Sequence, residues 1–169
     1  MRFQATTILS CIFCLFLTVA ITHAADYKNW LDLLPASIDG LEKAGDPEGA
    51  NMESGGKSWS SLEQDYAGDS NRHIDLVIVT GAMSPQVRTF NNMPDINMES
   101  EGKIAKSLKV SGYQAFLELN KNNSSGRLII AVQEQTIVVI EADPVDGEKK
   151  LLSLADQVPL DRIAREISS

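Results

Sequence analysis

The sequence has few of the residues that carry covalent catalysis or bind transition metals. Both of its cysteines and one of its two histidines lie within the first 24 residues, which leaves His73 as the histidine of the remaining chain. A structural zinc site needs about four ligands at characteristic spacing. Many serine hydrolases carry their nucleophile in a Gly-x-Ser-x-Gly turn, and the sequence lacks this motif. We therefore expect a protein that is not an enzyme and that folds without a cofactor or a metal ion.

Basic residues are also scarce, with 15 lysines and arginines against 23 aspartates and glutamates and a formal net charge of −8. Nucleic acids and anionic lipids bind proteins through clustered basic side chains. The densest basic segment holds Lys103, Lys106 and Lys109, which we interpret as a solvated strand edge. The composition therefore argues against nucleic acids and anionic membrane surfaces as partners.

The one long hydrophobic run is at the N-terminus, where Arg2 precedes an apolar stretch over residues 8–21. This stretch is shorter than the roughly 20 residues that a membrane-spanning helix needs. Thr22 and Ala24 then provide the small residues that precede a signal peptidase site. The sequence predicts a signal peptide over residues 1–24. It also predicts an exported protein, periplasmic or secreted, that has no transmembrane anchor after cleavage.

Cleavage before Ala25 would leave a single globular domain over residues 25–169. This domain contains no cysteine, so no disulfide would hold its fold. The removed segment carries one arginine and no acidic residue, so the net charge of the remaining chain would be −9. We expect no internal repeat and no second domain.

The first segment after the predicted cleavage site has the apolar spacing of a short helix. Tyr27, Trp30, Leu31 and Leu34 stand at i, i+3, i+4 and i+7, and Asp26 is suited to the N-cap. A helix this short needs something to pack against. We favour packing against its own sheet. The alternative is that these four residues are the surface for an envelope or extracellular protein partner.

Strand signals dominate the rest of the chain, as alternating or continuously apolar runs separated by short turns. The expected strands are residues 58–66, 73–80, 104–110, 113–119, 127–132 and 136–141. Residues 40–57 are rich in glycine and predict a surface loop, and residues 84–92 predict a short helical turn.

Two helices are expected after the strands. Residues 146–158 form an amphipathic helix suited to cover the apolar hairpin over residues 128–140, and residues 160–167 form a short terminal helix. The predicted fold class is α+β, an antiparallel sheet of about six strands with a short N-terminal helix and a C-terminal helix packed on one face.

Acidic residues around one predicted turn are candidates for a metal site. Asp65, Asp69 and Asp75 provide carboxylates that a hard cation such as calcium could use, although their spacing is not that of an EF-hand. His73 shares a strand face with Asp75, and we favour its interpretation as a hydrogen-bonded residue at a strand edge. The three aspartates remain candidate ligands.

Two other motifs have simpler explanations. Residues 54–58 read Ser-Gly-Gly-Lys-Ser and resemble the end of a P-loop, but no hydrophobic strand precedes them and no helix is expected after them. Met83, Met93 and Met98, with Met52 further off, could ligate Cu(I), but such methionines are more often packing residues.

Five segments carry a resemblance to known proteins: residues 30–35, 58–66, 110–115, 128–140 and 158–161. Their layout resembles that of small exported bacterial proteins without assigned activity. It is also similar to the Mog1/PsbP-like fold, a sheet flanked by helices that mostly serves in binding and assembly. No catalytic motif comes with this resemblance.

We therefore predict a non-catalytic periplasmic or secreted binding and interaction module. The alternative is a carrier of a small ligand or a metal ion, held by the acidic hairpin or by an apolar pocket beside the sheet.

Overall fold

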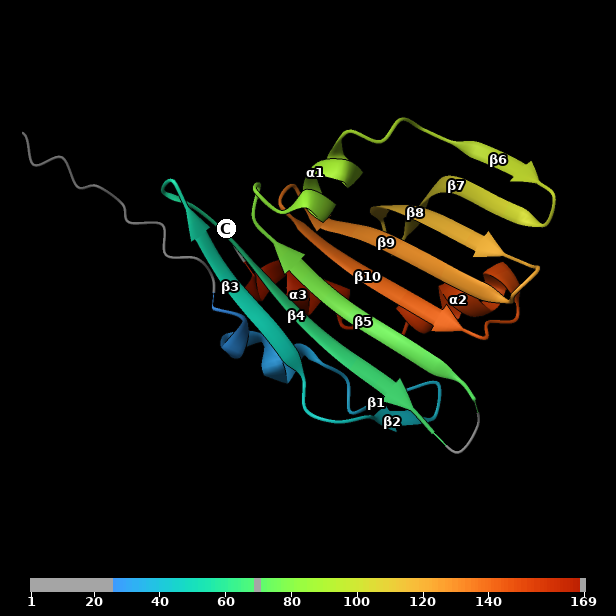
Figure 1. The fold of residues 1–169 in the computed structure, drawn as a ribbon, viewed down its shortest axis with the longest axis horizontal. Coiled ribbons are helices and arrows are strands. Elements are labelled where there is room, and N and C mark those ends of the chain that lie inside the picture. Colours follow the sequence, from blue (N-terminus) through green and yellow to red (C-terminus); the bar gives the residue numbers. More distant parts are fainter. Residues whose placement is uncertain (1–25, 69–70, 168–169) are drawn as a thin grey trace, which may run out of the picture.

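The computed structural model describes residues 26–68 and 71–167, so the predicted signal peptide and Asp69 lie outside the described residues. Figure 1 shows the described chain as one large sheet with helices on both sides. In chain order the elements are η1 (Tyr27–Leu33), β1 (Ser37–Ile38), β2 (Leu41–Lys43), β3 (Glu48–Ser54), β4 (Lys57–Ala67), β5 (His73–Thr80), α1 (Pro85–Asn91), β6 (Asn97–Ser100), β7 (Lys103–Val110), β8 (Tyr113–Asn120), β9 (Ser125–Gln133), β10 (Thr136–Asp143), α2 (Gly147–Ala155) and α3 (Leu160–Glu166). Among the described helices, none is both long enough and apolar enough to cross a membrane.

All ten strands belong to one antiparallel sheet, in the order β1-β2-β4-β5-β10-β9-β8-β7-β6, with β3 paired to β4. The α+β class, the hairpin of β4 and β5, and the meander from β7 to β10 are confirmed. The predicted number of about six strands is wrong, because β1, β2, β3 and β6 were not expected.

The four unexpected strands lack an apolar sequence pattern from which they could be predicted. Every residue of β3 and β6 is exposed, and β1 and β2 are two and three residues long. Strand β3 lies in the glycine-rich segment that predicted a loop. Gly55 and Gly56 have φ angles of 59° and 71°, which suit the two-residue turn that pairs β3 with β4. The segment that resembles a P-loop is this hairpin turn.

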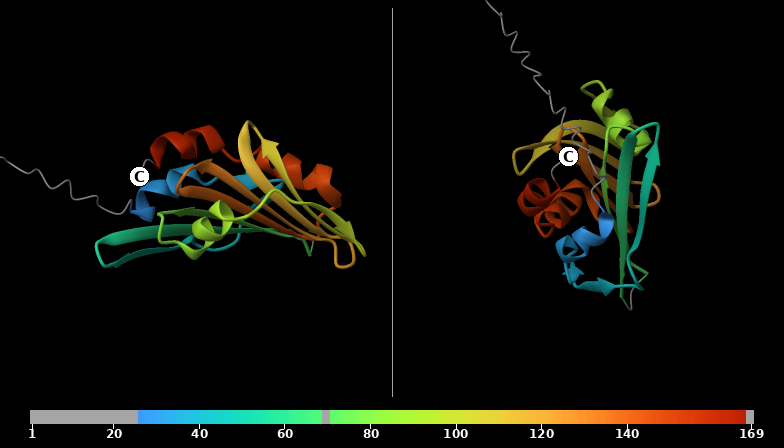
Figure 2. Two further views of the ribbon diagram at one scale, coloured as in Figure 1. Left: turned by 90° about the horizontal axis from the view of Figure 1, so that it is seen from above. Right: turned by 90° about the vertical axis from the view of Figure 1, so that its left-hand side faces the viewer.

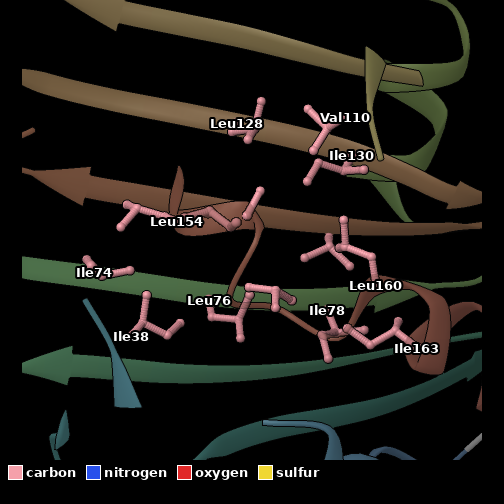
Figure 3. Close-up of a cluster of buried hydrophobic side chains, with 14 of the residues drawn as sticks. Ile38, Ile74, Leu76, Ile78, Val110, Leu128, Ile130, Leu154, Leu160 and Ile163 are labelled. Carbon is pink, nitrogen blue, oxygen red and sulfur yellow. The ribbon is translucent and has the colours of Figure 1, made fainter. Parts of the chain in front are cut away.

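One face of the sheet, called the inner face below, is covered by η1, α2 and α3 (Figure 2). Leu76 of β5 and Leu128 and Ile130 of β9 project from this face. They belong to one buried cluster with Leu154 of α2 and Leu160 at the start of α3 (Figure 3). The prediction that a C-terminal helix covers the hairpin of β9 and β10 is confirmed. The main core therefore lies between the inner face and these three helices.

The N-terminal helix η1 is a 3₁₀ helix, with the Asp26 side chain accepting a hydrogen bond from the backbone N–H of Lys28. The predicted α-helical period is wrong for this segment. A 3₁₀ helix has three residues per turn. Trp30 and Leu33 therefore share the buried side, whereas Leu31 is 39% exposed.

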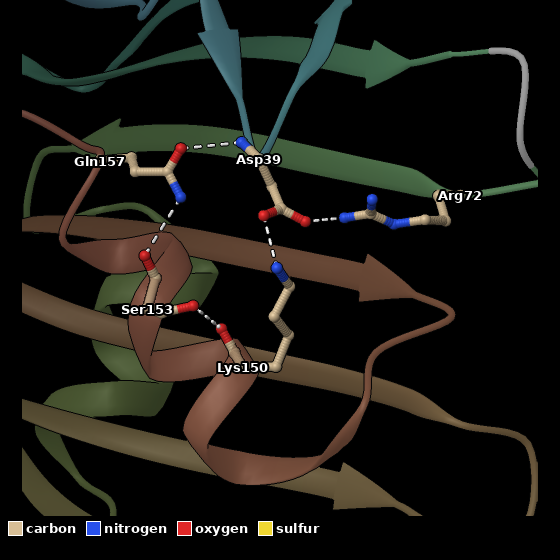
Figure 4. Close-up of polar contacts among 5 residues, drawn as sticks. All are labelled: Asp39, Arg72, Lys150, Ser153 and Gln157. Atoms are coloured by element: carbon tan, nitrogen blue, oxygen red, sulfur yellow. Dashed lines mark hydrogen bonds and ion pairs between the residues drawn. The ribbon is translucent and has the colours of Figure 1, made fainter.

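The turn between β1 and β2 is attached to α2 through Asp39 (Figure 4). The Asp39 backbone N–H donates to Gln157 Oε1 at 2.8 Å, and Gln157 Nε2 donates to the carbonyl of Ser153 at 3.2 Å. The Asp39 carboxylate forms ion pairs with Arg72 and Lys150. These contacts fix the short β1–β2 hairpin against the end of the helix layer.

The opposite face, called the outer face below, carries only α1 among the described helices (Figure 2). Val87 of α1 packs on a second apolar cluster that includes Phe116, Ile129 and Val139 of the sheet. The helix begins at Ser84, whose side chain accepts a hydrogen bond from the backbone N–H of Val87. This seven-residue helix leaves the ends of β5, β9 and β10 on the outer face without a helical cover.

Candidate functional site

A row of polar side chains crosses the uncovered part of the outer face. Residues directly opposite each other on neighbouring strands project from the same face of a sheet. The strand register aligns, from β4 to β6, Asp65, Asp75, Glu141, Arg127, Glu118, Ala105 and Met98. Three acidic residues on adjacent strands therefore stand side by side at one end of the row.

Asp75 is the most perturbed group of this row. Burial raises its pKa from 3.8 to about 6, and a hydrogen bond with Asp65 and the negative charges of Asp65 and Glu63 add to the rise. The imidazole of His73 acts in the opposite direction, with its Nε2 2.6 Å from Asp75 Oδ1. Burial and the charge of Asp65 also raise the pKa of Glu63. Negative charge is therefore crowded at the β4–β5 end.

The structure brings two of the three predicted metal ligands together. Asp65, His73 and Asp75 each offer one ligand atom, and these three atoms all lie within 4.8 Å of one another. Asp69 lies outside the described residues. The expectation that His73 and Asp75 share a strand face is confirmed by their contact, with His73 Nε2 2.6 Å from Asp75 Oδ1. Imidazole nitrogen and carboxylate oxygen are both ligands of zinc and other first-row divalent ions.

A hollow of about 480 Å³ opens beside the row, at the ends of β5, β8, β9 and β10. Its charged lining has both signs, with the acidic residues Asp75, Glu118, Glu141 and Asp143 and the basic residues Lys103 and Arg127. The imidazole of His73 also lines the hollow. Arg127 Nε lies 3.0 Å from Glu141 Oε1, so this pair is largely neutral. The volume falls within the usual range of small-ligand sites.

A second hollow of about 400 Å³ lies beside α1 on the same face. Phe90, Met93, Phe116 and Ala131 form its apolar lining. Its lining also includes polar residues such as Asn91 and Gln114, and its use as the predicted apolar ligand pocket stays a prediction.

Two of the four methionines lie far apart. Met52 lies on β3 and Met98 on β6, at opposite edges of the sheet. Neighbouring strands are about 4.8 Å apart, so the six strands from β4 to β7 keep these two sulfur atoms far beyond a shared coordination sphere. Met52 therefore cannot belong to a copper site that includes Met98.

The candidate partner surface at the N-terminus is divided by burial. Trp30 and Leu34 pack into the core, Tyr27 is half-buried against it, and Leu31 is exposed. Most of the aromatic surface of Tyr27 and Trp30 is therefore buried inside the molecule and is not exposed to a partner.

The expectation of no internal repeat is wrong. Residues 51–62 and 97–108 are identical at eight of twelve positions and share the sequence Asn-Met-Glu-Ser-x-Gly-Lys-x-x-x-Ser-Leu. Both copies fold as a hairpin, β3–β4 and β6–β7, with a two-residue turn between Ser54 and Lys57 or between Ser100 and Lys103. Comparing the sequence with itself would have revealed this feature, whereas apolar periodicity could not.

Comparisons with known proteins found no similar protein. No family model matches the chain, and neither a curated protein nor a solved structure matches it significantly. The functional argument therefore rests on the chemistry of the outer face.

Proposed function

We propose that this protein is an exported, non-catalytic binding module that takes an extended ligand across the uncovered outer face. The observation that carries the proposal is the charged hollow of about 480 Å³ on the face that the helices leave uncovered. Three helices cover the inner face, whereas α1 is the one described helix on the outer face and leaves this hollow open. Antiparallel sheets commonly keep one face in solvent, so the hollow and its charges, and not the exposure alone, point to a ligand.

The chemistry of the hollow indicates a ligand with charges of both signs. Asp75 supplies negative charge at the β5 side, and Lys103 supplies positive charge on β7. The sheet order places four strand spacings of about 4.8 Å between β5 and β7, or roughly 19 Å. An extended peptide advances about 3.3 Å per residue. A segment of about six residues with a basic and an acidic end therefore matches the hollow, and an exported protein partner would supply such a segment.

The test uses a capped hexapeptide with lysine and glutamate at its two ends, titrated into ¹⁵N-labelled protein. We expect amide shifts at the residues of the hollow, and an uncharged hexapeptide of the same length should cause none. Lys103→Ala should weaken binding about fivefold, the value of one partly exposed charge contact. Lys109→Ala is the matched control, because it removes an exposed lysine of the same strand outside the hollow. Equal effects of the two variants would overturn the proposal.

A second candidate function is the transport of a divalent cation. The observation in its favour is the convergence of Asp65, His73 and Asp75 within 4.8 Å. In isothermal titration with Zn²⁺ at pH 7.5, His73→Ala and Asp75→Asn should each abolish binding. Asp143→Asn should preserve it, because Asp143 stands opposite His73 but outside the three-residue cluster. Lys103→Ala separates the two functions, since it should weaken the peptide and leave Zn²⁺ binding unchanged.

A further inference from the structure

The repeated segment places the same four residues at both edges of the sheet. Asn51-Met52-Glu53-Ser54 lies on β3 and Asn97-Met98-Glu99-Ser100 lies on β6, and we call these the edge motifs. All residues of both strands are exposed, and no further strand pairs with β3 or β6 in the part of the chain that the structure describes. Met52 and Met98 are 52% and 50% exposed. An exposed edge strand is a template for pairing with another strand.

The two edge motifs also have the same hydrogen-bonding phase. In a two-residue hairpin the residues that flank the turn exchange backbone hydrogen bonds, and the direction of the backbone groups then alternates along the strand. Ser54 and Ser100 flank their turns. The N–H and C=O groups of Asn51 and Glu53, and likewise those of Asn97 and Glu99, therefore point away from the sheet.

We propose that copies of this chain associate edge to edge, β6 of one copy pairing antiparallel with β3 of the next. Placing Met98 opposite Met52 sets Asn97 opposite Glu53 and Glu99 opposite Asn51. Both flanking pairs then have outward backbone groups on each strand, which an antiparallel hydrogen-bonded pair requires. This pairing, called the join below, continues the sheet of one copy into the sheet of the next. It does not depend on the ligand proposed for the outer face.

The side chains of the edge motifs complement each other in this register. Each glutamate carboxylate stands opposite an asparagine amide, which can donate a hydrogen bond to it, and no like charges are opposed. Because Met52 is paired with Trp59 and Met98 with Ala105, both methionines project from the outer face and meet there.

The edge combinations differ in how they use groups that already have partners. The Asn51 amide donates to Asp26 at 2.8 Å, and Lys121 donates to Glu99 at 2.8 Å. Pairing β3 with β3, or β6 with β6, would place one of these two groups in each flanking pair. Joining β6 to β3 places both in the Glu99–Asn51 pair and brings together Asn97 and Glu53, whose side chains make no hydrogen bond among the described residues. The contact between one pair of short strands is small, so the association is weak and concentration-dependent. It is also head-to-tail, so it builds open chains, or rings where the rotation between copies closes.

Disulfide trapping tests this register. Directly opposed residues that are not hydrogen-bonded have Cα atoms about 4.5 Å apart, within the range that a disulfide spans. Met52→Cys and Met98→Cys are made separately in full-length chains that carry Cys11→Ser and Cys14→Ser. We expect a mixture of the two variants under mild oxidation to form crosslinked dimers about tenfold faster than either variant alone. Met83→Cys is the control partner, because Met83 is exposed but lies on neither edge.

A second variant checks that backbone pairing is responsible. Asn97→Pro removes an N–H group that points away from β7, so the hairpin should keep its own hydrogen bonds while the join loses one. Added to the Met98→Cys chain, it should slow crosslinking to the rate of the Met83→Cys control, whereas Asn97→Thr should not. The proposal is overturned if the mixed pair crosslinks no faster than the control, or if Met52→Cys alone crosslinks fastest, since that outcome indicates a symmetric β3 dimer.

Discussion

Asp65 and Asp75 stand directly opposite each other on β4 and β5, with a carboxylate oxygen of one within 4.8 Å of a carboxylate oxygen of the other. Like charges in this position destabilise a sheet. Burial and the charge of Asp65 raise the pKa of Asp75 to about 6, so the pair holds a proton in mildly acidic solution. The outer face thus retains an unfavourable pair at its uncovered end, which a cationic group of a ligand or a divalent ion would relieve.

Asp75→Asn should make the protein more stable at neutral pH. The folded-state pKa of about 6 lies above the ordinary 3.8, so the folded protein binds this proton more tightly than the unfolded chain. Stability contributed by Asp75 is therefore present below pH 3.8 and is lost as the pH rises to about 6. Thermal melts from pH 4 to pH 7.5 should show a higher Tm for the variant near pH 7 and a flatter pH dependence. Asp95→Asn, at an exposed site away from the row, is the control, and parallel curves for wild type and Asp75→Asn would contradict this account.

Trp30→Ala should destabilise the fold by about 3–5 kcal/mol, the usual cost of removing a large buried aromatic side chain. Trp30 is 2% exposed and belongs to the main core. Leu31→Ala, one residue further along η1, should change stability by less than about 1 kcal/mol because Leu31 is 39% exposed. Urea unfolding measures both. Comparable losses for the two variants would mean that η1 does not pack as described.

Gly81→Ala should destabilise the protein more than Gly40→Ala. Both glycines have positive φ angles, 110° and 77°, so both substitutions strain the backbone. At Gly81 a Cβ atom would also lie 2.5 Å from the carbonyl oxygen of Ser58 and 2.7 Å from Trp59 Cα, whereas at Gly40 no atom lies within 4 Å. The difference in unfolding free energy between the two variants isolates the cost of this contact, which we expect to exceed about 1 kcal/mol. Equal losses would show that the β5–α1 connection yields to the added atom.

The chain purified from its native host should begin at Ala25. The apolar stretch that precedes this residue is too short to span a membrane and ends in small residues suited to signal peptidase. Intact-mass spectrometry of the exported fraction provides the measurement. A mass that includes residues 1–24 would refute the predicted processing, and the export part of the proposed function with it.

How much the sequence could predict depended on burial. The runs around Leu76, Leu128 and Ile140 predicted central strands because residues buried in a sheet are apolar and often β-branched. The C-terminal helices were predictable for the same reason, since their apolar stripes face the core. Strands β3 and β6 gave no such signal, because edge strands with exposed side chains are held by backbone hydrogen bonds that any sequence can make.

The candidate site was partly accessible from the sequence. His73 and Asp75 are two residues apart on one strand, so their shared face follows from the period of a β-strand. Glu141 and Arg127 come from two other strands, and only the register of the folded sheet aligns them with Asp75. Lys103 comes from a third strand, and only the folded sheet places it in the same hollow. Likewise only the structure shows that η1 is a 3₁₀ helix in which Leu33 is buried and Leu31 is exposed.

The sequence by itself determined the α+β class, the central hairpins, the helices that cover them and the repeated edge motifs, because each depends on local pattern or on identity within the chain. Tertiary structure alone decided which face stays uncovered, which charges meet across it and that both edge motifs end at free edges. These properties depend on strand order and register, which arise from contacts between residues far apart in the chain.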